Sequence, residues 1–116
     1  MKWLVLALGI LLAMPAHAML EDGNRALSLE VRGKNGGFDR DAYQETRNEI
    51  SQLVADGTID RFSVYRYYSS GGFAACIELG ATALTSRVRE LQARFQRIPY
   101  DASTTAFYVG IEQHCR

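Results

Sequence analysis

Two runs of alternating apolar and polar residues, 58–68 and 71–79, stand on either side of a short turn. The first run reads TIDRFSVYRYY and the second GGFAACIEL. If Ser70-Gly71 forms a two-residue hairpin turn, all the strongly apolar residues of both runs lie on one side of the hairpin. The predicted cross-strand pairs are Phe62 with Leu79, Val64 with Ile77, and Tyr68 with Phe73.

The glycines of this turn have two interpretations. A phosphate-binding loop leads from a strand into the N-terminus of a helix, and a lysine followed by serine or threonine often comes after its glycines. Here Gly71 and Gly72 lie between two strand patterns, and no such lysine follows. The pattern therefore favours a hairpin turn, in which glycine supplies the positive φ angles.

Two other segments carry apolar residues at helical spacing. The first follows Asp39 or Asp41, either of which can cap it, and runs to about Asp56. The second follows Thr82 as its expected cap and ends before Pro99. The positions expected in the core are Tyr43, Ile50, Leu53 and Val54 in the first helix and Leu84, Val88, Leu91, Phe95 and Ile98 in the second.

Strand patterns also lie at both ends of this region. ALSLEVR, residues 26–32, alternates with a period of two, and so does the beginning of TTAFYVGIEQHC, residues 104–115. The resulting order is strand, helix, strand, strand, helix, strand. This order predicts an α+β fold of the ferredoxin-like type, with a four-stranded antiparallel sheet and two helices on one face.

The first residues, MKWLVLALGILLAMPAHA, have the layout of a secretory signal peptide. Lys2 precedes an apolar run that is shorter than the roughly 20 residues of a membrane anchor and is broken by Pro15. The small residues before position 19 predict cleavage after Ala18. We therefore expect residues 1–18 to be removed and residues 19–116 to form one small α+β domain. This domain would be periplasmic or extracellular, without membrane attachment.

The charge of the expected mature chain is close to neutral. The whole sequence has 13 basic and 13 acidic residues, and cleavage removes one basic residue, Lys2. A near-neutral chain lacks the bulk positive charge that draws proteins to nucleic acid. Its histidine, cysteine and aspartate residues also lack metal-ligand spacing. We expect no nucleic-acid partner, no metal and no cofactor.

Two cysteines, Cys76 and Cys115, remain after the expected cleavage. An even pair in a small exported domain predicts a disulfide, which would contribute at most about 4 kcal/mol by closing the chain between them. In the predicted strand order their strands are about 9 to 10 Å apart, beyond the roughly 7 Å that a disulfide spans. The tail QHCR must therefore bend across the open sheet face. Otherwise the strand order differs, or the thiols are free or pair between chains.

The sheet face without helices is the expected interaction surface. Arginine and tyrosine are enriched in binding hot spots, although tyrosine is also a good strand former. We expect this face to bind a protein or a second copy of the chain. The candidate partner-binding residues are Arg32, Arg61, Tyr65, Tyr67, Glu78 and Tyr108.

The sequence shows no catalytic constellation. His114 precedes Cys115, but neighbouring strand residues point to opposite faces, and a cysteine in a disulfide cannot act as a nucleophile. Glu78 and Glu112 share the expected open face, but no third group completes an acid–base pair. We predict that the protein is not an enzyme. An exported enzyme with an unidentified site remains an alternative.

Two short stretches resemble known families. GGFAACIE resembles the central strand motif of RNA-recognition domains, although export and the charge argue against RNA binding. YYSSGGFAACIEL resembles the hairpin of subtilisin propeptides and their stand-alone inhibitor relatives. The second resemblance implies a protease inhibitor that uses its open sheet face and C-terminal tail, which is a further alternative.

Overall fold

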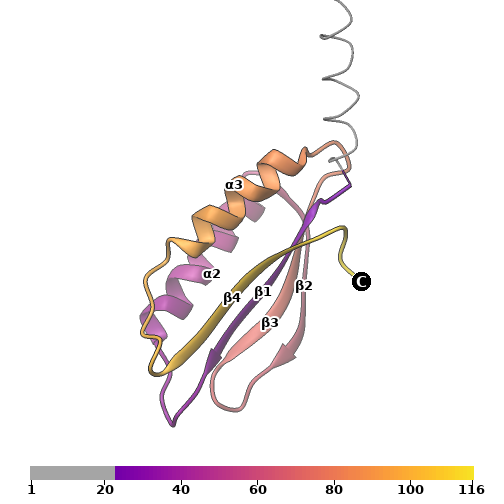
Figure 1. Cartoon of the computed structure of the whole chain (residues 1–116). Helices are drawn as coiled ribbons and strands as arrows, with labels where there is room; N and C mark the ends of the chain where they lie inside the picture. Colours follow the sequence, from indigo (N-terminus) through magenta and orange to yellow (C-terminus); the bar gives the residue numbers. More distant parts are fainter. Residues whose placement is uncertain (1–22) are drawn as a thin grey trace, which may run out of the picture.

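The computed structural model describes residues 23–116 as one four-stranded sheet with two helices beside it (Figure 1). The expected signal peptide, residues 1–18, lies outside the described residues. The elements are β1 (Ala26–Gly33), α2 (Arg40–Ala55), β2 (Ile59–Tyr67), β3 (Gly72–Leu79), α3 (Thr85–Gln96) and β4 (Thr105–Glu112).

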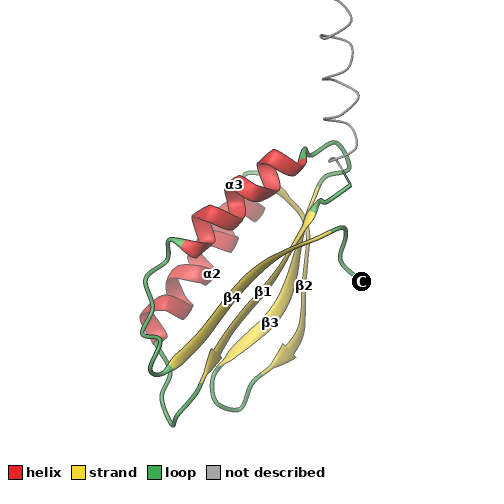
Figure 2. Cartoon of the chain, viewed as in Figure 1, coloured by secondary structure: helices red, strands yellow, loops and turns green. Residues whose placement is uncertain are grey.

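The strand order across the sheet is β2-β3-β1-β4, and every neighbouring pair is antiparallel. Both helices cover the same face (Figure 2). This arrangement confirms the predicted ferredoxin-like α+β fold. Because β1 and β3 occupy the centre of the sheet, β2 and β4 form its two edges.

The core lies between the sheet and the helices. Fully burying one large apolar side chain contributes roughly 1.5–3 kcal/mol to folding. The largest fully buried apolar side chains are Leu27, Leu29, Val31, Leu53, Ile77, Leu79, Val88, Leu91 and Phe95. All of them come from the helix-facing positions that alternation and helical spacing predict.

Helix α2 begins and ends where the sequence predicts. The Asp39 side chain caps it by accepting a hydrogen bond from the Ala42 N–H at 3.0 Å. Gly57 follows with φ of 82°, a conformation that favours glycine. Val54 was expected in the core, but it is 49% exposed because it lies beside the helix's buried stripe, near β2.

Helix α3 differs from the prediction at its beginning. It begins at Thr85, and the residue in the capping position is Leu84, which provides no side-chain hydrogen bond. Thr82 is therefore not the cap. Leu84 is 54% exposed and lies outside the core, since the turn before the helix extends two residues further than expected. Across the helix pair, Arg94 forms an ion pair with Glu49 of α2.

The β2–β3 hairpin is confirmed, but its turn is longer than two residues. The Tyr68 N–H donates to the Gly72 carbonyl at 3.1 Å, which leaves three residues in the loop. Gly71 and Gly72 have φ of 105° and 95°, as the hairpin interpretation requires. The longer loop shifts the register by one residue, and the irregular step between Val64 and Arg66 shifts it by one more. Phe62 therefore faces Ile77, and Val64 faces Ala75.

Two irregular steps in β2 change which side chains lie on which face. The register with β3 shifts between Ile59 and Arg61 and again between Val64 and Arg66. A bulge adds one unpaired residue and so reverses the alternation beyond it. Tyr67 therefore pairs with Phe73 on the helix-covered side, and the prediction that Tyr67 lies on the open face is wrong.

Candidate functional site

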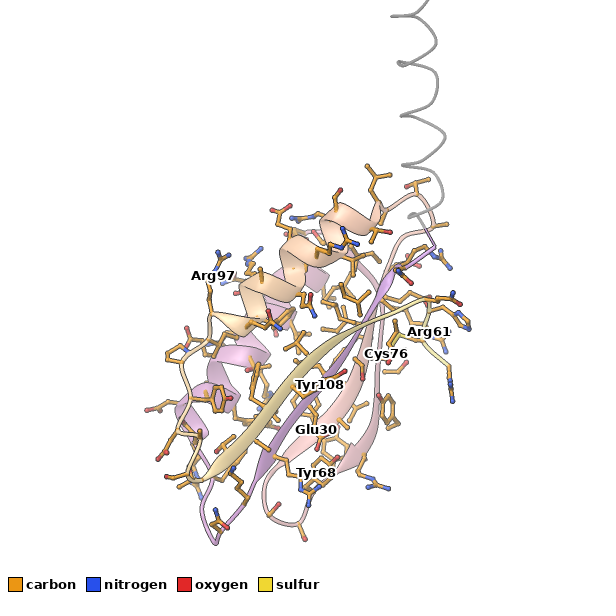
Figure 3. All side chains as sticks on the ribbon, in the orientation of Figure 1. Glu30, Arg61, Tyr68, Cys76, Arg97 and Tyr108 are labelled. Carbon is orange, nitrogen blue, oxygen red and sulfur yellow. A yellow bond between two sulfur atoms is a disulfide. The ribbon has the colours of Figure 1, made fainter. Side chains whose placement is uncertain are left out.

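The sheet face opposite the helices is formed by alternate residues of all four strands (Figure 3). The strand registers place five of the six candidate partner-binding residues on this open face: Arg32, Arg61, Tyr65, Glu78 and Tyr108. Ser28, Glu30, Arg66, Cys76 and Glu112 share it. The face thus combines arginine, tyrosine and glutamate side chains without a covering layer of helices.

The tail after β4 crosses one end of the open face. Cys115 forms a disulfide with Cys76 of β3, with their Cα atoms 5.7 Å apart. Since β1 lies between β4 and β3, the tail passes over β1 at Ala26. Ala26, Cys76 and Cys115 form a small buried cluster there, and the short side chain of Ala26 lets the tail approach closely. The bend anticipated from the strand spacing is therefore present.

Glu78 contributes to holding this tail in place. Its carboxylate accepts a hydrogen bond from the Cys115 N–H at 2.7 Å. Charge-assisted hydrogen bonds of this kind are stronger than neutral ones. Glu78 therefore fixes the tail beside the disulfide, a role that its predicted place among the partner-binding residues did not include.

Below the tail, the open face contains a hollow of about 510 Å³. Tyr65 lines one side and His114 and Arg116 of the tail another, together with Ser28, Cys76 and Glu112. The crossing of the tail brings His114 back over the sheet, far from where a continued β4 would carry it. Cys115 is in the disulfide and so provides no thiol to pair with His114.

Further along the open face, two guanidinium groups stack on one tyrosine. The Arg32 guanidinium lies 5.0 Å and the Arg66 guanidinium 5.9 Å from the centre of the Tyr68 ring. The Glu30 Oε1 atom is 3.9 Å from Nη1 of Arg32. We call Arg32, Tyr68 and Arg66 the Arg–Tyr–Arg stack. Cation–π contacts hold such groups in place while their N–H edges remain able to donate hydrogen bonds.

Neither Arg66 nor Tyr68 was among the predicted site residues. The pairing assumed from the sequence placed both on the helix-covered side. The bulge at Tyr65 places Arg66 opposite Ala74 and so on the open face. A bulge leaves no mark in the apolar alternation, so no signal in the sequence would have identified these two residues.

Tyr108 of β4 is 58% exposed on the same face and lies near Glu30 (Figure 3). Its ring extends over Gly110, two residues along the strand. A Cβ atom at Gly110 would collide with the Tyr108 hydroxyl. Because Gly110 has no side chain, the Tyr108 ring can lie against the strand there. The ring remains accessible to a partner.

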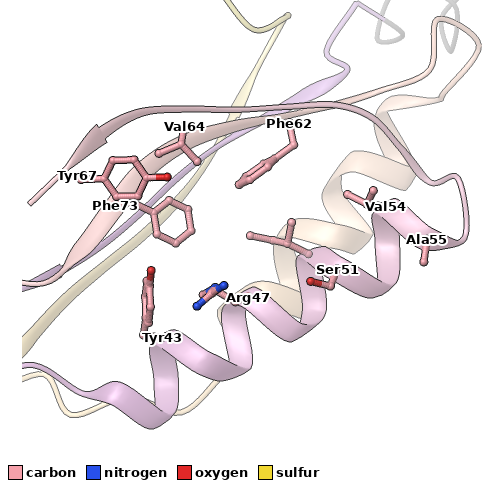
Figure 4. A pocket seen from close by; sticks show the side chains of 10 residues that line it. Tyr43, Arg47, Ser51, Val54, Ala55, Phe62, Val64, Tyr67 and Phe73 are labelled. Carbon is pink, nitrogen blue, oxygen red and sulfur yellow. The ribbon is translucent and has the colours of Figure 1, made fainter.

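A second hollow lies on the other side of the sheet, between α2 and the edge strand β2 (Figure 4). Its volume is about 670 Å³. Tyr43, Arg47, Ile50, Ser51, Val54 and Ala55 of α2 line it, with Phe62, Val64, Tyr67 and Phe73 of the sheet. We call it the α2–β2 groove. It exists because α2 does not extend fully over β2.

Three aspartates have lowered pKa values, and each stabilises a turn or a helix end. Hydrogen bonds from the backbone of Ala42 and then Asp101 lower the pKa of Asp39. Hydrogen bonds from the hydroxyl and the backbone of Ser103 lower the pKa of Asp101. Hydrogen bonds from the hydroxyl and the backbone of Thr58 lower the pKa of Asp56. These groups explain local structure and add no titratable group to the open face.

Within residues 23–116, no cluster of three histidine, cysteine, aspartate or glutamate side chains has the geometry to hold a metal ion. In the same part of the chain, no helix has both the length and the apolar character needed to span a membrane.

Comparisons of the chain with protein-family models, with curated proteins and with solved structures found no match. We therefore infer the function from the surfaces described above.

Proposed function

We propose that this protein is a small exported interaction module that binds an acidic, aromatic-containing segment of another protein on its open sheet face. The observation that carries the proposal is the Arg–Tyr–Arg stack, in which the guanidinium groups of Arg32 and Arg66 lie 5.0 and 5.9 Å from the centre of the Tyr68 ring. Tyr65 and Tyr108 extend the same face with exposed rings.

The chemistry of the stack favours carboxylate ligands. Arginine donates paired hydrogen bonds to a carboxylate, and stacking on a ring reduces the conformational freedom lost when it does so. The exposed tyrosines provide rigid apolar area together with a hydroxyl group. Side chains of these types dominate binding energy in protein interfaces. An acidic segment with aromatic residues therefore complements both the arginines and the tyrosines of the open face.

Export is part of the proposal. The Cys76–Cys115 disulfide is compatible with an oxidising compartment, where such bonds persist. The secretory pattern at residues 1–18 supports the same location.

The disulfide also bears on the protease-inhibitor alternative. A propeptide-like inhibitor presents its C-terminal tail to the protease, whereas Gln113–Cys115 is here fixed to the sheet. The available contact surface is therefore the face rather than the tail.

A direct test uses a fluorescent random copolymer of glutamate and tyrosine, with a lysine–tyrosine copolymer for comparison. We expect the acidic copolymer to bind and its affinity to fall with added salt, because exposed charges are screened. Arg32→Ala and Arg66→Ala should each weaken binding by about tenfold. Fluorescence anisotropy provides the dissociation constants.

Arg97→Ala is the matched control, because it removes the same charge from the far end of α3, away from the open face (Figure 3). Unchanged affinity in this variant is expected. Equal binding of the lysine copolymer, or no loss in the Arg32 and Arg66 variants, would contradict the proposal.

A further inference from the structure

The edge strand β2 has an exposed apolar surface that the proposed binding face does not use. Phe62 is 38% and Tyr67 75% exposed, and both line the α2–β2 groove together with Val54. Contiguous exposed apolar surface is typical of an interaction site. An edge strand also presents backbone N–H and C=O groups that another strand can pair with.

The opposite edge, β4, is less available. Helix α3 packs beside it, and the Gln92 side chain donates a hydrogen bond to the Val109 carbonyl at 3.0 Å. At the β2 edge, α2 does not cover the strand fully, and the α2–β2 groove stays open (Figure 4). If the sheet extends by adding a strand, β2 is therefore the favoured edge.

The side chains of β2 are arranged symmetrically about Ser63. Four of its residues lie on the helix-covered side. Ile59 and Tyr67 are each four positions from Ser63, and Phe62 and Val64 are each one position from it. If a second copy of β2 runs antiparallel with the two Ser63 residues opposite each other, each helix-side residue therefore faces a helix-side residue of the other copy.

The charged residues of β2 complement one another about the same point. The register shifts lie between Ile59 and Arg61 and between Val64 and Arg66, on either side of Ser63. Reversal about Ser63 places Asp60 on Arg66 and Arg61 on Tyr65. The first match joins opposite charges, and the second joins a guanidinium with an aromatic ring, which attract each other.

We propose that the protein forms a homodimer in which β2 pairs antiparallel with β2 of a second copy, with the two-fold axis at Ser63. The two sheets then become one continuous sheet, and all helices remain on the same face. Phe62 lies beside the partner's Val64, next to both α2–β2 grooves. Asp60 lies opposite the partner's Arg66, and the two-fold axis repeats this ion pair.

Neighbouring registers do not fit. If Phe62 faced the partner's Phe62, Ile59 would face the partner's Tyr65, which lies on the open face. If Val64 faced the partner's Val64, Phe62 would face the partner's Arg66. Directly opposed residues of a sheet must share a face, so only the register centred on Ser63 matches along the strand.

Cysteine cross-linking tests this register. Ser63 lies opposite Cys76, and a thiol there can exchange with the Cys76–Cys115 disulfide, so peptide mapping by mass spectrometry must show that the new bond joins the two introduced cysteines. Opposed Cα atoms of antiparallel strands are about 4.5–5.5 Å apart, within the range of a disulfide. We expect Ser63→Cys to form a disulfide-linked dimer of twice the monomer mass under mild oxidation. In Arg61→Cys, the matched control, the new cysteines lie four residues apart along the paired strands, about 13 Å, and should remain unlinked.

Charge reversal provides an independent readout by light scattering during size exclusion. Asp60→Arg and Arg66→Asp each place like charges opposite each other, so each variant alone should lose the dimer mass. When the two variants are mixed, every opposed pair again has opposite charges, and the dimer mass should return. The double variant should also be dimeric.

Three results would overturn the proposal. The unmodified protein could keep the monomer mass at high concentration, which would identify the bulges and charges of β2 as features that protect the edge. Ser63→Cys could link no faster than Arg61→Cys. The mixed charge variants could remain monomeric. The linkage of Ser63→Cys leaves Arg32, Arg66 and Tyr68 unchanged, so this experiment fails or succeeds independently of the binding experiment on the open face.

Discussion

At the scale of single residues, Gly72 shows how closely the hairpin approaches the rest of the sheet. A Cβ atom there would overlap the Val31 carbonyl oxygen and lie 3.2 Å from the Arg32 Cα. Gly72 also has φ of 95°, and it begins the strand that carries Cys76. Gly57 has a similar φ of 82°, but nothing lies within 4 Å of the corresponding Cβ position. Comparing substitutions at these two glycines therefore separates the cost of a left-handed backbone conformation from the cost of a steric overlap.

We predict that Gly57→Ala lowers the free energy of unfolding by about 1 kcal/mol, the cost of a left-handed conformation for alanine. Gly72→Ala should cost about 3 kcal/mol or more, because the backbone of β1 must also move. Urea denaturation of both variants measures the two losses. Equal losses would show that the close contact with Val31 does not constrain the hairpin.

At the scale of elements, the segment Gln113–Cys115 links the edge strand β4 to β3 across β1. The Gln113 carbonyl accepts a hydrogen bond from the Arg25 N–H at 3.1 Å, and the disulfide then fixes Cys115 to β3. The segment buries Ala26 and forms one wall of the hollow that contains His114. Its position decides how much of the open face a partner can contact.

We predict that replacing both Cys76 and Cys115 by serine lowers the free energy of unfolding by about 4 kcal/mol at most, since the bond constrains a segment of 39 residues in the unfolded chain. Urea denaturation of this variant, beside the wild type with and without reductant, measures the loss. Glu78→Gln is the control that keeps the disulfide and a hydrogen-bond acceptor, and it should lose much less. A wild type equally stable with and without reductant would contradict a stabilising disulfide.

At the scale of the whole molecule, the two helices on one face leave three surfaces with different chemistry. The open face carries the Arg–Tyr–Arg stack, the β2 edge carries the apolar groove, and α3 covers the β4 edge. The acidic partner would lie on the open face and the second copy on the β2 edge, and the two surfaces meet at Tyr65 and Arg66. A dimer through β2 would also place two open faces side by side, so that one extended partner could contact both.

The sequence was sufficient for the order of the elements, because the side chains that are buried in the strands and helices follow alternation and helical spacing. It was insufficient for the register and for the faces beyond Val64. The bulge at Tyr65 changes no apolar pattern, yet it exchanges the sides of Tyr67 and Tyr68. The exposure of Val54 depends on how far α2 reaches across β2, which is a property of the packed structure.

The most direct test of the proposed function is an NMR titration of the isotope-labelled protein with the glutamate–tyrosine copolymer. The account predicts that backbone amide signals of Arg32, Arg66, Tyr68 and their neighbours on the open face shift together. Signals of α3 should stay in place. Shifts confined to the α2–β2 groove, or none at saturating copolymer, would show that the open face does not bind acidic segments.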